Sequence, residues 1–151
     1  VEVVTISGMG GSLMSDILQA GEAVVRSLKQ LVLQPNLAAH LLRRWAVEHG
    51  WHIEQEKLLY EEGRYYVVIA LRPGAGAELS EADLWLGPEL IAARQPLLVE
   101  YVRKEWQAEK IILEQVAKSD SDEARQKRQK LEAKWENIRE VMRCQFGVEI
   151  L

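Results

Sequence analysis

Cysteine is almost missing from this chain of 151 residues, in which only Cys144 is present. A single thiol excludes an internal disulfide and a cysteine-rich metal site, and it is typical of a reducing compartment, so we expect the cytoplasm. Histidine is also scarce, and His40, His49 and His52 show no ligand spacing with other donors. We therefore predict no metal site.

Long apolar runs are missing as well, and without about 18 consecutive apolar residues we expect no membrane span. The opening Val1-Glu2-Val3-Val4 has no basic lead-in and no cleavage site, so no signal peptide is predicted. The chain starts inside a strand-like run without an initiator methionine, and we expect it to belong to a longer polypeptide. With 48% apolar residues, 28% charged residues and a net charge of -4, it can bury a real core.

The first part of the chain alternates between strand and helix patterns. A β-branched run over residues 1–6 ends at glycine and predicts a buried strand. Residues 12–20 then show an apolar spacing near 3.6, which predicts a helix with one apolar face. That face is formed by Leu13, Met14, Ile17 and Leu18.

A second strand and helix follow. Residues 30–34 form a short apolar strand that Pro35 ends, because proline cannot donate to a ladder. Asn36 is placed to cap a helix over residues 37–49. The inner stripe of this helix is Leu41, Leu42 and Trp45.

Two further strands come without a helix between them. Residues 51–60 and 64–71 are separated by only Glu61-Glu62-Gly63, which predicts an antiparallel hairpin. The element order β, α, β, α, β, β indicates an open α/β sheet of which one half is present.

The composition changes after residue 72. Residues 73–87 are predicted to be a linker, and residues 88–151 a helical domain with helices over 88–116 and 122–144. Two antiparallel helices would bury both apolar stripes in a coiled-coil hairpin. The stripes are Leu98, Val102, Leu113 and Val116 in the first helix, and Leu131, Trp135, Ile138 and Met142 in the second.

Four motifs follow one another along the chain. They are Ile6-Ser7-Gly8-Met9-Gly10-Gly11, Leu33-Gln34-Pro35-Asn36, Glu61-Glu62-Gly63 with Tyr66, and Leu86-Gly87-Pro88. In this order and spacing they resemble the bacterial tRNA (adenine-N1)-methyltransferases that modify adenosine 22 of tRNA. The resemblance implies the C-terminal half of a Rossmann-like class I methyltransferase sheet followed by a coiled-coil domain. The acidic, glycine-containing cofactor motif of that family is not in this sequence, which implies a missing N-terminal cofactor-binding half.

Ligands of open α/β sheets bind outside the carboxyl ends of the strands, so the glycine turn and the Gln-Pro-Asn segment should share one edge. The resemblance implies S-adenosyl-L-methionine as cofactor and tRNA as substrate. Gly8, Met9, Gly10 and Gly11 would then form the lip of the cofactor and adenine pocket. Gln34 and Asn36 would act as catalytic polar contacts to the base, with Pro35, Arg43 and Tyr66 binding substrate, Arg43 through a phosphate. A tight strand-to-helix turn is the structural alternative for the glycines, and core packing is the alternative for Tyr66.

A basic cluster lies near the predicted tip of the helical hairpin, at Arg125, Lys127, Arg128 and Lys130. It can meet an RNA backbone. A solvated helix face is the alternative, because acidic and basic residues are equally numerous from residue 88 onward.

Two other functions stay open at this stage. The chain can be a non-catalytic RNA-binding or interaction module, in which the half-sheet only anchors the helices. An α/β protein acting on another nucleotide rests on fold analogy alone. The oligomeric state is not predicted.

Overall fold

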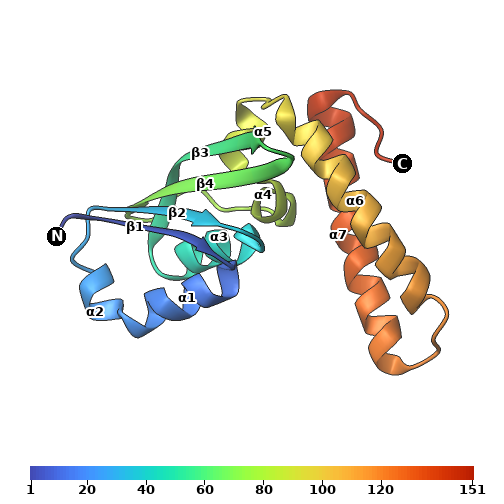
Figure 1. Ribbon diagram of the computed structural model, residues 1–151, viewed down its shortest axis with the longest axis horizontal. Helices are drawn as coiled ribbons and strands as arrows, with labels where there is room; N and C mark the ends of the chain where they lie inside the picture. The colour runs from blue at the N-terminus through green and yellow to red at the C-terminus, as the bar shows by residue number, and fades with distance from the viewer. The chain divides into compact units, whose positions relative to one another are not determined.

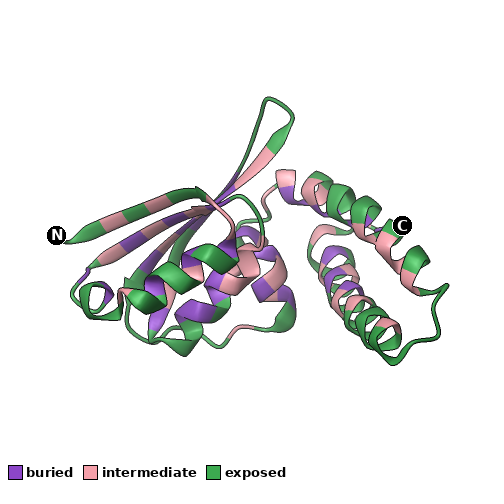
Figure 2. Ribbon diagram, turned by 60° about the horizontal axis from the view of Figure 1, so that its bottom comes forward, coloured by how far each residue is buried: buried purple, intermediate pink, exposed green.

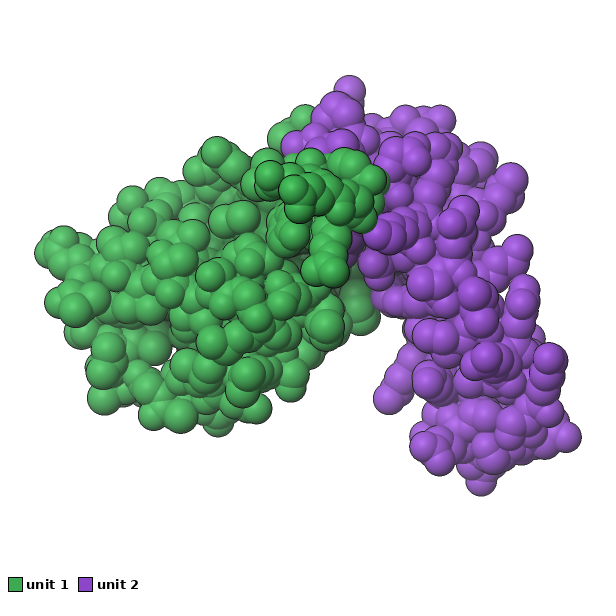
Figure 3. All heavy atoms as spheres, in the orientation of Figure 1, with its two compact units in different colours: residues 1–93 green, residues 94–151 purple.

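The computed structural model describes residues 1–151, and the chain divides into two compact units, residues 1–93 and 94–151 (Figure 3). None of its helices combines the length and the apolar composition needed to cross a bilayer.

The first unit is an α/β fold with a mixed four-stranded sheet (Figure 1). β1 and β2 are parallel, while β4 runs antiparallel to both β2 and β3, and the strand order is β1-β2-β4-β3. The elements are β1 Val3–Met9, α1 Gly11–Ala20, α2 Glu22–Val25, β2 Gln30–Pro35, α3 Ala39–Glu48, β3 Trp51–Glu61, β4 Arg64–Pro73, α4 Glu81–Leu86 and α5 Pro88–Ala92. The predicted order of strands and helices is confirmed up to the end of β4, apart from the short α2, which the sequence pattern did not predict. The predicted burial of the first strand is wrong, because β1 is an edge strand and none of its residues is fully buried.

The hairpin of β3 and β4 is confirmed. Glu61 pairs with Arg64, so only Glu62 and Gly63 connect the strands. Both have positive φ, 49° and 79°, which is the conformation of a type I′ turn and matches the right-handed twist of the strands.

One face of the sheet is covered and the other is partly open. On β2 and β4, alternate side chains are fully buried, and α1 and α3 pack beside each other over the sheet (Figure 2). The buried set includes Leu31, Leu33, Ile69 and Leu71. The opposite face presents Val32, Val68 and Ala70, which are only half-buried, and Thr5, which is exposed. The core of this unit therefore lies on the helix side.

Helix α1 buries less than its pattern predicted. Met14 and Leu18 are buried, but Leu13 and Ile17 are 53% and 40% exposed. The helix contacts the sheet and α3 through the Met14–Leu18 row only, so the neighbouring row faces solvent.

The predicted start of α3 and its cap are wrong. The helix begins at Ala39 rather than at residue 37, and its N-cap is Ala38, which makes no side-chain cap bond. Leu37 is outside the helix because its carbonyl oxygen accepts the Gly11 N–H at 2.9 Å. Asn36 is thus free of the capping role that the sequence suggested.

The predicted linker contains a helix. Ser80 starts α4 with a capping box, in which its Oγ accepts the Asp83 N–H and the Asp83 carboxylate accepts the Ser80 N–H. The single helix predicted over residues 88–116 is divided, because Pro96 separates α5 from the next helix and Arg94 has a φ of 49°. The boundary between the units falls after residue 93, so it differs from both predicted boundaries.

The second unit is a pair of helices, α6 Leu97–Val116 and α7 Asp122–Phe146, which pack against each other (Figures 1 and 2). Ser121 caps α7 by accepting the Ala124 N–H. The buried residues of the two helices are Leu98, Val102, Trp106, Trp135, Ile138 and Met142, and Ile150 after α7 is also buried. The charge of Glu109 on α6 is paired with α7. Its carboxylate accepts from Lys134 Nζ at 2.6 Å and from Trp135 Nε1 at 2.7 Å.

Candidate active site

The glycine turn and the Gln-Pro-Asn segment lie side by side at the carboxyl ends of β1 and β2. In the parallel ladder Ser7 pairs with Gln34, and Met9 pairs with Pro35. Beyond the ladder the Asn36 N–H donates to the Met9 carbonyl at 2.8 Å. The predicted convergence of the two segments at one edge is therefore confirmed.

The glycines of this turn have different reasons to be glycine. A side chain on Gly11 would place its Cβ 2.2 Å from the Ala38 carbonyl oxygen, so close backbone approach requires this glycine. Gly8 has a φ of 76° and nothing within 4 Å of a Cβ, and a Cβ on Gly10 would meet only Leu37, at 3.7 Å. Gly11 therefore serves the fold, whereas Gly8 and Gly10 leave backbone open for a ligand.

The N-terminus of α1 has neither a side-chain cap nor an acidic residue nearby. Gly10 is its N-cap, no side chain caps the helix, and the first turn carries no acidic residue. The Gly11 N–H donates to the Leu37 carbonyl, but the other N–H groups of the first turn and the positive end of the helix dipole suit an electronegative group of a ligand. This end of the helix and the open glycines fit a small polar cofactor held on one side.

Asn36 and Tyr66 are the two further side chains that the sequence assigned to the site. Asn36 is exposed, and its side-chain amide makes no hydrogen bond. The ladder between β2 and β4 ends at the pair Leu33 and Ile69, so no strand pairing fixes Tyr66 relative to Asn36. Tyr66 is half-buried and precedes the buried Val67, so it lies on the partly open face of the sheet.

Gln34 lies between the two segments. Its Oε1 accepts the Gly8 N–H at 3.3 Å, and its Nε2 donates to the Pro35 carbonyl at 3.3 Å. Pro35 itself is buried. Both ends of the Gln34 amide are thus engaged within the protein.

The phosphate contact expected from Arg43 is contradicted by its burial. The side chain is 1% exposed, and its Nε donates to Glu56 at 2.7 Å while Nη1 donates to the Leu84 carbonyl at 2.9 Å. Glu56 Oε1 also accepts the Glu89 N–H at 3.0 Å. A charged residue inside the apolar stripe of a helix was the sequence signal for such a buried pair. The neighbouring Arg44 is the exposed one, and it lies 3.7 Å from Glu81.

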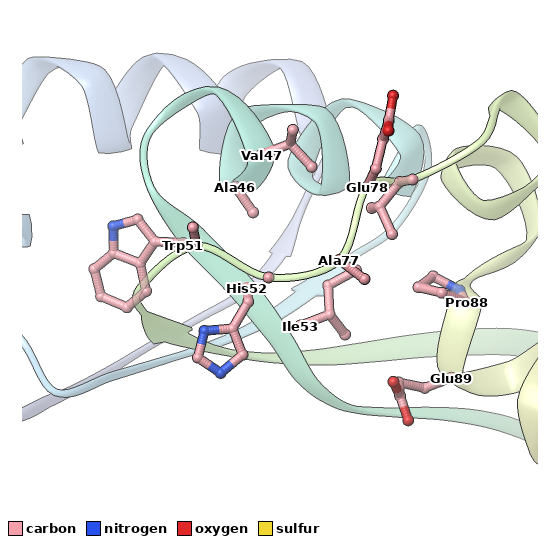
Figure 4. A pocket seen from close by; sticks show the side chains of 12 residues that line it. Ala46, Val47, Trp51, His52, Ile53, Ala77, Glu78, Pro88 and Glu89 are labelled. Atoms are coloured by element: carbon pink, nitrogen blue, oxygen red, sulfur yellow. The ribbon is translucent and has the colours of Figure 1, made fainter.

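The sequence did not reveal a separate cavity of about 440 Å³ beside β3. It is lined by the end of α3, the start of β3 and residues 75–79, which cross over β3 in Figure 4. Trp51 and Ile53 give it an apolar wall, and Glu78 and Glu89 are at its margin. Because β1 and β3 are the opposite edges of the sheet, this cavity is distinct from the glycine turn.

The basic cluster lies near the start of α7 and is exposed. Arg128 pairs with Glu132 at 2.8 Å and Arg125 lies 3.9 Å from Asp122, whereas Lys127 makes no ion pair. No group of three or more His, Cys, Asp or Glu side chains is placed to hold a metal ion. The segments 7–12 and 34–38 contain no ionisable side chain.

Comparisons with known proteins show relatives with this fold. A curated tRNA (adenine(22)-N(1))-methyltransferase of Bacillus subtilis is 30% identical over 148 residues, which are 93% of this chain and 62% of that protein. A Streptococcus pneumoniae protein solved in complex with S-adenosyl-L-methionine superposes with a TM-score of 0.79 at 34% identity, covering 94% of this chain and 60% of that one. A Streptococcus agalactiae protein of the NADB-Rossmann superfamily gives a TM-score of 0.76 at 30% identity, with 94% and 60% covered.

The chain thus spans about three fifths of the length of these relatives. The family model of TrmK, the tRNA (adenine(22)-N(1))-methyltransferase, matches residues 1–140. The chain belongs to the TrmK family of tRNA (adenine(22)-N(1))-methyltransferases.

Proposed function

We propose that this chain is the C-terminal part of an enzyme that transfers a methyl group from S-adenosyl-L-methionine to N1 of adenosine 22 in tRNA. The observation that carries the proposal is the convergence of the open glycine turn with Asn36 at the strand ends, in a chain of this family.

A missing N-terminal half would complete the sheet and the cofactor site. β1 is an edge strand, and its Val3 is 49% exposed. The open row of α1, with Leu13 and Ile17, and the partly open face of the sheet support the same conclusion, because such surfaces are normally covered in a doubly wound fold. The 62% coverage of the Bacillus subtilis relative is consistent with this proposal.

The chemistry needs little from side chains. S-adenosyl-L-methionine supplies a methyl group made electrophilic by a positively charged sulfur, and neutral adenine N1 is already a nucleophile. The protein therefore has to align the two and exclude water. Gly8 and Gly10 allow backbone to approach a flat base closely, and Asn36 offers both a donor and an acceptor to its edge. Tyr66 stacks on the base once it has left the RNA helix.

The helices α6 and α7 form a coiled-coil hairpin that seats tRNA in this proposal. Lys127 offers the unpaired charge, and Arg125 and Arg128 can exchange exposed carboxylate partners for phosphates. Such an enzyme acts where tRNA is processed, and we infer a cytoplasmic location.

The test uses the full polypeptide, including any upstream coding sequence, with purified tRNA and methyl-labelled cofactor. Gly10→Val should abolish methyl transfer while the protein stays folded, because a Cβ there meets only the Leu37 side chain, at 3.7 Å, and the added methyl groups narrow the approach to the turn. Gly21→Ala, at the end of α1, is the matched control and should retain activity.

Undiminished methyl transfer by Gly10→Val would remove the turn from the site. A parent protein that binds tRNA but transfers no methyl group would instead support the non-catalytic RNA-binding module.

A further inference from the structure

The parallel ladder of β1 and β2 is broken at the place where the glycine turn begins. Ser7 pairs with Gln34 and Met9 pairs with Pro35, which leaves Gly8 without a partner residue in the register. Such a bulge normally leaves the backbone groups of the extra residue unpaired. Pro35 also has no backbone N–H, so it cannot donate a ladder hydrogen bond at this point.

The side-chain amide of Gln34 supplies hydrogen-bonding groups at this unpaired position. Its Oε1 accepts the Gly8 N–H, and its Nε2 donates to the carbonyl of Pro35, the next residue on the same strand. Gly8 is exposed and in a left-handed conformation, and nothing lies within 4 Å of the place that a Cβ would take. Backbone hydrogen bonds from Asn36 to Met9 and from Gly11 to Leu37 hold the rest of the turn, and the amide of Gln34 adds the contact for Gly8 itself.

We infer that Gln34 is a positioning residue for the proposed methyl transfer, acting as a substitute ladder partner for Gly8 rather than as a direct contact to the base. This revises the role expected from the sequence. The effect of Gln34 on catalysis rests on the proposed function, whereas the hydrogen bond from the Gly8 N–H to Gln34 Oε1, here called the Gln34–Gly8 bridge, does not. Asn36, whose amide has no partner in the protein, remains the side chain that reads the base.

The chain offers a matched control on the same strand and the same face. Gln30 lies four residues before Gln34, and its Nε2 donates to Glu54 Oε2 at 3.0 Å, away from the turn. Gln30→Met and Gln34→Met remove the same amide group with little change in side-chain volume.

The experiment measures Gly8 amide exchange by NMR and methyl-transfer kinetics, both in the full polypeptide. Gln34→Met should speed Gly8 exchange about fivefold, as expected for the loss of one weak hydrogen bond. It should lower kcat about tenfold or more, through misalignment, with KM for tRNA within twofold. Gln34→Glu keeps an oxygen acceptor for Gly8 but loses the donor to the Pro35 carbonyl, so it should restore slow Gly8 exchange and only part of kcat, while Gln30→Met should change neither value.

Unchanged Gly8 exchange in Gln34→Met would overturn the inference, and so would faster exchange with an unchanged kcat. Equal loss of activity in Gln34→Met and Gln34→Glu with Gly8 still protected would indicate direct base contact instead. If the parent protein transfers no methyl group, the proposed function fails, but the exchange data still decide whether the bridge exists.

Discussion

Arg43 shows how a single buried charge can hold several segments of a fold together. It joins α3 to Glu56 on β3 and to the carbonyl of Leu84 on α4, with both charged side chains almost fully buried. Removing one partner of a buried pair leaves an uncompensated charge. We expect Arg43→Met to lower the free energy of unfolding by about 3–5 kcal/mol, measured by urea denaturation of the full polypeptide.

Arg44→Met is the control, because that arginine is exposed and its ion pair is long. It should cost less than about 0.5 kcal/mol. Equal effects of the two substitutions would contradict a structural role for Arg43, and would reopen the question of a phosphate contact.

Glu105 on α6 gives a pH-dependent prediction. Desolvation of its carboxyl and, second, the nearby Glu109 raise the pKa of Glu105 above its ordinary value of 4.5, although the residue as a whole is exposed. The folded state then binds the proton more tightly, so the free energy of unfolding falls as pH rises from 4.5 through the raised pKa and stays lower above it. Glu105→Gln should therefore stabilise the protein at neutral pH, by about 0.5 kcal/mol or less, and have no effect below the ordinary pKa.

Melting temperatures measured between about pH 4 and pH 7.5 check this prediction. Glu114→Gln, an exposed change on the same helix, is the control. A stabilisation by Glu105→Gln that is as large at pH 4 as at pH 7 would rule out the titration of this carboxyl as its cause.

In the strand–turn–helix element from β1 to α1, one glycine is required for packing and another is available for ligand access. Gly11→Ala forces a Cβ against the carbonyl of Ala38, so the two segments have to move apart. We expect it to destabilise the protein by about 2 kcal/mol or more in urea denaturation. Gly10→Ala, with an extended φ of -71° and a contact of 3.7 Å, should change stability by less than about 0.5 kcal/mol. Equal costs at the two positions would mean that the close approach at Gly11 does not limit the fold.

The sequence predicts those elements whose turn residues, caps and apolar spacing all lie within the element. The hairpin of β3 and β4 and the long helix α7 were found because turn residues, caps and apolar spacing agree there. The start of α3 was misplaced because Leu37 is held by Gly11, a contact that no local pattern encodes. Helix α4 was missed within a segment dominated by glycine and alanine, although its capping box was readable.

The candidate site was predictable to the same degree. Parallel strands with their loops at one edge bring Gly8 and Asn36 together by topology alone. The burial of Arg43 and the bridge from Gln34 depend on tertiary contacts between segments, and sequence spacing does not report these.

The molecule as a whole carries only one wall of the proposed cofactor site. The turn after β1 has a neighbouring loop on the β2 side only, because β1 is the edge of the sheet. A ligand resting on Gly8 and Gly10 would therefore be contacted from one side and stay largely in water, and affinity requires most of a small ligand to be buried. We expect the 151-residue chain alone to bind S-adenosyl-L-methionine at least about a hundredfold more weakly than the full polypeptide.

Isothermal titration calorimetry of both proteins measures this difference. The solvent-exposed edge of β1 also predicts self-association of the isolated chain, so its oligomeric state is measured in parallel by analytical ultracentrifugation. Adding the proposed N-terminal half as a separate polypeptide should restore binding if it pairs with β1, and Val3→Pro, which interferes with strand pairing there, should prevent that restoration. Equal affinity of the isolated chain and the full polypeptide would show that this chain holds the complete cofactor site, contrary to the division of the site proposed for it.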